Sequence, residues 1–535
     1  MNLPELSASA HPQFVDAASC KRWLEHVPLA NVVVAQQDLL AELEVFNRFP
    51  TAVANRLAVM EALREAVSFV QVEQAKRFMN RPLPMAKTEA SAFEDTIELW
   101  EQMRLGYLRC LDAALAGDAA MRGQAALIAQ RVTAYCGLKM LHYYRAYREV
   151  PPREWRALHQ AYLHAERLGV AEEPVKDFLS RDIQDSSSRI AYARAVLMGM
   201  CNPHELSQRQ LTFVAYLLER WAAKLEVSRE PVDEGEGAPP LIADLGGERC
   251  PERADPAPLK AAEPRYLDGR KLAKSLRNRV GLLRKGESPA KLALGEDCVQ
   301  PSCEQTLVFL FRQWCQAKTA RAVQRARSSA IAQVSNDLEA IHHYVSGGTA
   351  RRAVHGADLT HQQRQELETL GHIRTTDERD ASGTRLATIE EWKVEDDSAQ
   401  GMHLVRAAAT AGRRYSHGQL LAVRPSDATS FLLGHVRWLM GAANGDLHAG
   451  VRLMPGIPIA TTVRSVGLNV SERPVAALRL DAMPALQAPA TLVLPAGWFK
   501  PKRILEIVGD KPLNVRLNEV IERGLDFERV TYEPA

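Results

Sequence analysis

The feature that most constrains the fold is a change in the spacing of apolar residues along the chain. Before about residue 345 apolar residues recur every three or four positions, as on one face of a helix; Leu57, Met60 and Leu63 within Val53–Met79 are an example. After about residue 386 the spacing becomes two, as on a strand with one buried face. The sequence therefore predicts a multidomain α-then-β protein. An all-helical bundle or irregular solenoid comes first, and a small antiparallel β-barrel with a further β extension follows.

The helical part is predicted in most detail where turn residues bound the periodic stretches. Asp118, Pro151-Pro152 and Gly169 punctuate the pattern, as helix boundaries do. The expected helices are Val53–Met79, Glu94–Leu115, Ala120–Tyr147, Glu154–Leu168 and a long or broken helix over Leu307–Val345. No residue consensus repeats along them, so no named repeat family is indicated.

Composition and periodicity together give the expected domain boundaries. Prolines and glycines concentrate in 228–267, with an apolar run at Leu241–Leu245 that predicts one short strand. The expected parts are a helical domain at 1–227, a Pro/Gly-rich linker or crossover at 228–267, a helical segment at 268–345, a flexible arm at 346–385, a β-barrel at 386–470 and a β-rich extension at 471–535.

The β region consists of short alternating runs separated by turn residues. Asn444-Gly445 lies between two of these runs and is a strong hairpin signal. The expected strands are Leu386–Val394, Gln419–Val423, Phe431–Leu439, Gly450–Met454, Thr491–Leu494, Ile504–Val508 and Leu525–Val530. Whether 471–535 extends the first barrel or forms its own module is left open by the sequence.

Charge and targeting signals predict a cytoplasmic protein. Lys and Arg number 67 against 65 Asp and Glu, so the whole molecule exerts no strong pull on nucleic acid or acidic lipid. The first residues lack a signal-peptide pattern, and no apolar run approaches the roughly 20 residues of a membrane-spanning helix. The eight cysteines are scattered and predict buried free thiols in a reducing compartment.

Common catalytic motifs are incomplete in this chain. Gly281 and Gly286 have the spacing of a P-loop, but Glu287 and Ser288 follow where a lysine and then Ser or Thr are required. His204-Glu205 begins like a zinc-protease helix but has no second histidine ligand. We therefore predict a protein that is not an enzyme and that needs no cofactor or metal.

Two basic stretches allow two interpretations. One surrounds residues 270–285, and the other consists of Lys318, Arg321, Arg325 and Arg327, expected on a helix. Each is either a phosphate-contacting face or the solvated side of a packed helix. The near-neutral net charge favours the solvated side.

One short motif carries a specific hypothesis. Asp396-x-Ser398-x-x-Gly401 follows an alternating strand and precedes the runs FLLGHVRW and AGVRLM. Over about 375–470 the chain resembles the PilZ domain, a small β-barrel that binds cyclic-di-GMP through a [D/N]xSxxG motif. The alternative is a plain turn, since Asp, Ser and Gly are ordinary turn residues. His417, His435 and His448 lie among these strands and are interpreted as surface or hairpin residues.

The resemblance implies a binding site. A carboxylate can accept from guanine N–H donors, a hydroxyl and backbone amides suit phosphate oxygens, and arginine forks match phosphate. In PilZ domains two arginines of an RxxxR motif lie at the domain entrance. Here Arg374 and Arg379 occupy that place with four residues between them, so the spacing differs by one. The predicted ligand-binding residues are Arg374, Arg379, Asp396, Ser398 and Gly401.

Three functions follow as hypotheses. The first is a bacterial signalling effector that binds cyclic-di-GMP, orders the 346–385 arm and relays the signal to a protein partner. The second is a nucleotide-independent scaffold with a degenerate PilZ-like barrel. The third is a nucleic-acid-binding protein that uses the barrel together with the 270–285 basic face, and its binding would weaken steeply with salt.

Overall fold

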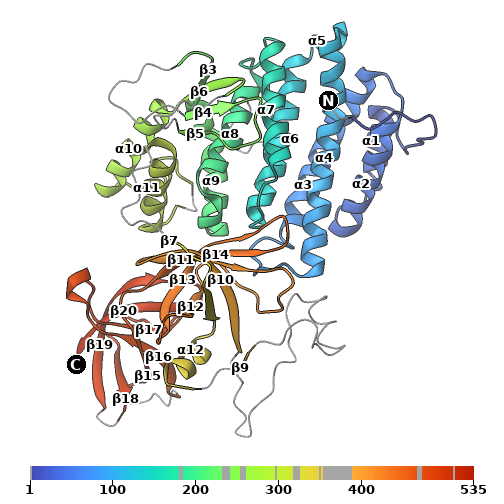
Figure 1. Cartoon of the computed structure of the whole chain (residues 1–535). Helices are drawn as coiled ribbons and strands as arrows, with labels where there is room; N and C mark the ends of the chain where they lie inside the picture. Colours follow the sequence, from blue (N-terminus) through green and yellow to red (C-terminus); the bar gives the residue numbers. More distant parts are fainter. Residues whose placement is uncertain are drawn as a thin grey trace. The chain divides into compact units, whose positions relative to one another are not determined.

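The computed structural model describes residues 3–179, 185–231, 241–253, 261–295, 298–316, 326–348, 351–352, 388–466, 473–509 and 512–535. Contacts between Cα atoms divide the chain into two compact units. Unit 1 contains Met1–Asn80 and Glu89–Ala320, and unit 2 contains Arg81–Thr88 and Arg321–Ala535. Unit 1 is mainly helical and unit 2 mainly β, as Figure 1 shows. The predicted α-then-β fold class is confirmed.

Helices α1–α9 form the larger part of unit 1 (Figure 1). They are α1 Ala17–Leu24, α2 Val32–Arg48, α3 Val53–Ala75, α4 Lys87–Ala116, α5 Ala119–Arg122, α6 Ala125–Arg145, α7 Pro152–Arg167, α8 Ser188–Met200 and α9 Gln208–Trp221. The four helices predicted before residue 170 therefore exist, and the one expected at Ala120–Tyr147 is divided into α5 and α6. Helix α6 is central: it packs against both α7 and α8.

Local sequence explains where several of these helices begin. Asp16, Ser187 and Ser207 lie just before α1, α8 and α9, and each side chain accepts a hydrogen bond from a backbone N–H of the first turn. Such caps satisfy donors that have no partner within the helix and contribute about 1 kcal/mol each.

The rest of unit 1 departs from a plain linker followed by helices. The described part of 228–267 contributes to a four-stranded sheet in the order β3-β6-β4-β5. Its strands are β3 Glu226–Ser228, β4 Leu241–Asp244, β5 Glu252–Arg253 and β6 Pro264–Asp268. The predicted strand at Leu241–Leu245 corresponds to β4. Helices α10 Arg270–Arg284 and α11 Ser302–Cys315 follow. Earlier in the chain, after α7, two short antiparallel strands pair with each other: β1 Val175–Lys176 and β2 Asp185–Ser186.

The first barrel of unit 2 is a ring of six strands. Strand β10 pairs with both β8 and β11, and the ring continues β11-β14-β13-β12-β8. Its strands are β8 Ile331–Ser335, β10 Thr388–Ser398, β11 Gly401–Arg406, β12 Leu420–Pro425, β13 Leu432–Gly441 and β14 Leu447–Leu453. Two short strands, β7 Ala326–Arg327 and β9 Arg351–Arg352, add to β10 from outside the ring.

The second barrel is closed by six consecutive strands in the order β15-β16-β17-β20-β19-β18. They are β15 Pro458–Ser465, β16 Val475–Leu480, β17 Thr491–Pro495, β18 Ile504–Val508, β19 Leu513–Arg523 and β20 Phe527–Pro534. The β extension predicted at 471–535 is thus a module of its own, which also takes in β15.

One apolar cluster joins the two barrels. Helix α12, Leu338–Val345, contributes Ile341 and Tyr344, the first barrel contributes Leu420 and Leu433, and the second contributes Leu478. Burial of such side chains contributes about 1.5–3 kcal/mol each, so this cluster holds the barrels together.

Two sequence-based expectations for residues 268–345 and the cysteines need correction. The region predicted as helical through Val345 contains β7 and β8 between α11 and α12, because the alternating run Ile331–Ser335 pairs with β10 and β12. Cys298 and Cys303 form a disulfide, whereas Cys20, Cys110, Cys136 and Cys201 are buried free thiols as predicted. The predicted arm at 346–385 lies almost wholly outside the described residues.

Candidate functional site

The predicted Asp-x-Ser-x-x-Gly motif forms the hairpin between β10 and β11. Asp396 and Ser398 are at the C-terminal end of β10. A two-residue turn follows, and Gly401 begins β11 opposite Ser398. The structure therefore brings Asp396, Ser398 and Gly401 together. Arg374 and Arg379, the other predicted ligand-binding residues, lie outside the described residues.

Ser398 and Gly401 have a structural role in this hairpin. The Ser398 hydroxyl donates a hydrogen bond to the Gly401 carbonyl oxygen over 3.1 Å. A Cβ atom on Gly401 would lie 2.5 Å from the backbone oxygen of Val451 in β14. Only glycine allows this close approach of two strands, so the glycine is required by the barrel itself.

Asp396 lies where three strands meet. It is opposite His403 of β11 and opposite Arg327 of β7, and the register of β10 shifts just before it. Such a shift marks a β-bulge, which turns side chains to a new direction. The Asp396 side chain is 27% exposed, and its Oδ2 is 3.9 Å from His403 Nδ1.

Aromatic side chains lie next to this carboxylate. His403 Nε2 is 3.0 Å from His448 Nδ1, and the His403 ring centroid is 4.9 Å from that of Trp438. A carboxylate beside an imidazole, which in turn contacts an indole, combines an acceptor with flat surfaces, and this suits a heteroaromatic ligand with N–H donors. Sequence analysis missed His403, although its position two residues after Gly401 placed it on the motif hairpin.

The histidine predictions are only partly right. His448 is half-buried in contact with His403, and His417 is also half-buried. His435 is buried, with Nδ1 3.2 Å from Glu522 Oε1 of β19, so its interpretation as a surface residue is wrong. Burial lowers its pKa, against the opposing effect of Glu522.

Strand β7, which pairs with Asp396, directly follows two arginines that the sequence analysis expects on a helix. Strand β7 begins at Ala326, and Arg327 is on this strand. The residues directly before it are Arg321-Ala-Val-Gln-Arg325, which have the RxxxR spacing that Arg374 and Arg379 lack. Arg321 and Arg325 lie outside the described residues.

A buried ion pair supports the hairpin from inside the barrel. Arg406 Nη1 of β11 is 2.8 Å from Glu390 Oε2 of β10, with side-chain exposures of 4% and 3%. Trp392 Nε1 donates to the same carboxylate over 3.1 Å, and the Arg406 guanidinium lies 5.4 Å from the Trp392 ring. Paired and hydrogen-bonded in this way, two charges can be buried without an unsatisfied group.

The basic stretch at 270–285 is largely used within unit 1. Arg270, Lys271 and Arg284 pair with Asp268, Glu226 and Glu304. The guanidinium of Arg279 lies 5.1 Å from the Trp221 ring, and that of Arg277 lies 5.7 Å from the Phe311 ring. These contacts favour the interpretation of a packed helix with a solvated side.

Two searches for other sites found none in the described part of the chain. No group of three or more His, Cys, Asp or Glu side chains there is arranged to hold a metal ion. No helix there is long and apolar enough to span a membrane.

Comparison with known proteins gives matches at both ends of the chain. Residues 18–232 match the family described as "Cyclic-di-GMP receptor FimW, N-terminal domain", and residues 461–535 match the "FimW C-terminal beta-barrel domain". The chain is 26% identical over 218 residues to the cyclic-di-GMP receptor FimW of Pseudomonas aeruginosa. That match covers 40% of this chain and 36% of the relative, so it spans about a third of the relative's length. The two family matches flank the residues that form the first barrel.

Proposed function

We propose that this protein is a cytoplasmic cyclic-di-GMP receptor that binds the nucleotide at the β10–β11 hairpin of its first barrel and relays binding to a protein partner. The name of the relative and the two family matches support the ligand class. The observation that carries the site is the pairing of β7 with Asp396, because β7 directly follows Arg321-x-x-x-Arg325.

The proposed roles follow from the chemistry of the ligand, which has two phosphates and two guanine edges. Asp396 accepts hydrogen bonds from guanine N–H donors, and its exposure of 27% leaves room for this. The Ser398 hydroxyl and the backbone near Gly401 contact phosphate oxygens. Arg321 and Arg325 take the phosphates or the guanine O6 and N7 in a bidentate manner.

Chain connectivity favours Arg321 and Arg325 over Arg374 and Arg379. Two residues of extended chain span at most about 7 Å, and Arg325 is two residues from Arg327, which is paired with Asp396. Arg374 and Arg379 are further from β10, since it begins at Thr388. They remain the second candidate pair.

The same connectivity suggests how binding is relayed. The last segment of unit 1 ends at Ala320 and the larger segment of unit 2 begins at Arg321, so the proposed arginines lie at the start of that larger segment. A ligand held by both this segment and the hairpin stabilises the arrangement in which the two are together. A protein partner would then recognise this ligand-bound arrangement of the segment and the hairpin.

One observation favours the scaffold as a second candidate. Ser398 and Gly401 are both used to build the hairpin, so the motif has a structural reason to exist without a ligand. In that case the barrels and helices would bind only protein.

Calorimetric titration of the full chain with cyclic-di-GMP tests the proposal. We expect binding in the micromolar range or tighter, lost in Asp396→Ala and in the double variant Arg321→Ala/Arg325→Ala. The matched control is Arg374→Ala/Arg379→Ala, which should bind normally. Loss of binding in that control alone would show that Arg374 and Arg379 are the ligand-binding arginines. Absence of both heat and thermal shift at about 100 µM ligand would contradict the receptor and favour the scaffold.

A further inference from the structure

Unit 1 contains a cavity that the proposed nucleotide site does not use. Its volume is about 420 Å³, and it is lined by residues of α3, α4, α6, α8 and α9. This volume lies within the roughly 300–1,000 Å³ of small-molecule sites. The lining holds five cationic side chains, Lys76, Arg64, Arg131, Arg145 and Arg194, and three carboxylates, Asp177, Asp185 and Glu219. Glu61 and Glu73, which are not part of the lining, pair with Arg131 and Lys76, so these charges balance in number.

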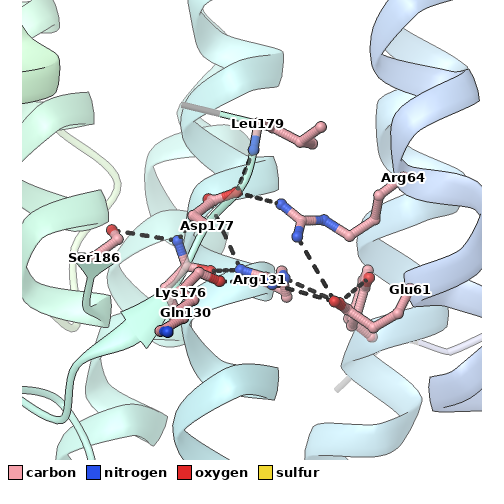
Figure 2. Close-up of polar contacts among 9 residues, drawn as sticks. Glu61, Arg64, Gln130, Arg131, Lys176, Asp177, Leu179 and Ser186 are labelled. Atoms are coloured by element: carbon pink, nitrogen blue, oxygen red, sulfur yellow. Dashed lines mark hydrogen bonds and ion pairs between the residues drawn. The ribbon is translucent and has the colours of Figure 1, made fainter. Parts of the chain in front are cut away.

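At one wall of the cavity the arginines are fully compensated, as Figure 2 shows. Arg64 Nη2 is 2.6 Å from Asp177 Oδ1, and Arg131 Nε is 2.9 Å from Glu61 Oε1. Gln130 also donates to Asp177, over 3.2 Å. Burial acts to raise the pKa of both carboxyls, but the adjacent arginines outweigh it and lower both pKa values.

Arg145 presents the opposite situation. It is the last residue of α6, and its Nε is buried without a hydrogen-bond acceptor. Its Nη1 is 3.5 Å from His142 Nε2, a weak contact to a ring that burial keeps neutral by lowering its pKa to about 3. In the part of unit 1 that the structure describes, Arg145 forms no ion pair with a carboxylate.

The charged group that most affects Arg145 is another arginine. Burial, together with the repulsion from Arg194, lowers the pKa of Arg145 to about 10, so the guanidinium stays charged at neutral pH. Arg194 itself pairs with Glu219 over 3.2 Å. The end of α6 attracts a cation through the helix dipole, but a partial charge does not replace a hydrogen-bond acceptor for the buried Nε of Arg145.

Other residues of the same lining are suited to a ring. Tyr144 is on α6, Tyr216 is on α9, and Met198 is on α8. Aromatic and thioether side chains provide flat, polarisable contact for a planar group. The Arg145 guanidinium, whose Nε has no acceptor, favours an anionic group on the same molecule.

We propose that this cavity is a second ligand site, which binds a small organic anion with a ring. The Arg145 guanidinium takes its phosphate or carboxylate group, and Tyr144, Tyr216 and Met198 contact its ring. Phosphate and carboxylate share the fork geometry that a guanidinium matches, so the source of the anion is left to the experiment. The proposal does not depend on the nucleotide site in the first barrel.

Thermal unfolding of the full chain with Arg145→Met tests this proposal. A cation whose Nε is buried without an acceptor and that has no counter-ion destabilises the protein, so the variant without ligand should have the same or a higher Tm than the wild type. A purely structural arginine would give a lower Tm when replaced. Arg48→Met, on an exposed position of α2, is the matched control for loss of one arginine and should change neither Tm nor binding.

The ligand arm uses three probes at matched ionic strength: inorganic phosphate, guanosine 5′-monophosphate and benzoate. At about ten times its Kd, the best probe should raise the wild-type Tm by roughly 2–4 °C. Arg145→Met should abolish this rise, and Arg48→Met should keep it. If guanosine 5′-monophosphate raises the Tm more than benzoate does, the anionic group of the ligand is a phosphate ester. If benzoate raises it more, the anionic group is a carboxylate. An equal rise in Arg145→Met and wild type, no rise with any probe, or a lower Tm of unliganded Arg145→Met would overturn the proposal.

Discussion

The two barrels of unit 2 have the same number of strands in their rings but differ in assembly and interior. The second barrel is built from one continuous stretch, β15–β20, around an apolar cluster that includes Val463, Leu492 and Leu505. The first is assembled from β8 and β10–β14, with α12 inserted in the chain between them, and it encloses the Glu390–Arg406 ion pair. The motif hairpin is on the first barrel, so the shared architecture does not decide which barrel binds a ligand.

The largest difference should appear when the ion pair of the first barrel is broken. Arg406→Ala leaves Glu390 buried without its cation, and we expect a loss of about 3–5 kcal/mol in the free energy of unfolding, measured by denaturant titration. Lys393→Ala on the same strand is the control. Its partner Glu395 is 49% exposed, so the change should be below about 1 kcal/mol. Equal losses in the two variants would contradict the view that burial gives the Glu390–Arg406 pair its larger effect on the free energy of unfolding.

Crowding at the hairpin should give the next largest effect. Gly401→Ala places a Cβ against the Val451 backbone oxygen, and we expect a loss of about 1–3 kcal/mol. Gly509→Ala in the second barrel is the matched control, because nothing lies within 4 Å of its Cβ position. A neutral Gly401→Ala would show that β11 and β14 can move apart without cost.

The contact between the barrels should depend weakly on pH through Asp526. Its Oδ1 accepts from the Leu420 N–H over 2.8 Å, and burial raises its pKa from 3.8 to about 6. Between these values the folded state binds the proton more tightly than the unfolded state. The contribution of Asp526 to the free energy of unfolding is therefore largest below about pH 4 and falls as the pH rises to about 6.

Asp526→Asn tests this pH dependence. The amide oxygen keeps the acceptor, so at pH 7 we expect a gain of roughly 1 kcal/mol or less, because solvent screens a partly exposed group. The variant should also lose the fall in Tm between pH 4 and 6. Asp481→Asn, 65% exposed, is the control and should leave that fall in place. A drop in stability in Asp526→Asn at pH 7 would show that the charged form is favoured.

The smallest effect on stability is expected at the motif hydroxyl. Ser398→Ala removes one half-exposed hydrogen bond to the Gly401 oxygen, so the free energy of unfolding should change by less than about 1 kcal/mol. Cyclic-di-GMP affinity should fall if the hydroxyl contacts phosphate, as proposed. A large loss of stability with unchanged affinity would assign Ser398 to the hairpin alone.

Local sequence predicted the parts of this molecule that local rules determine. The motif hairpin, the Asn444-Gly445 turn and β18 at Ile504–Val508 follow from alternation and turn chemistry within a few residues. The helices around α3 and α6 follow from their period in the same way. These elements were predicted because their signals do not depend on distant pairing.

The features that were missed depend on pairing over long distances. The run Ile331–Ser335 is short and follows a helix, and it becomes a strand because β10 and β12, far along the chain, pair with it. Arg327, which the sequence analysis expects on a helix, is likewise on β7, because this short strand pairs with β10. The burial of Arg406 with Glu390 and of His435 with Glu522 likewise requires partners that no spacing rule identifies.

Hydrogen exchange of the full chain with and without cyclic-di-GMP tests the central claim most directly. We expect the ligand to increase protection of β7 and of the β10–β11 hairpin, with no change in β15–β20 of the second barrel. The same comparison in Asp396→Ala should show no ligand-dependent protection. Protection confined to the second barrel or to the helices of unit 1 would contradict the assignment of the nucleotide site to the first barrel.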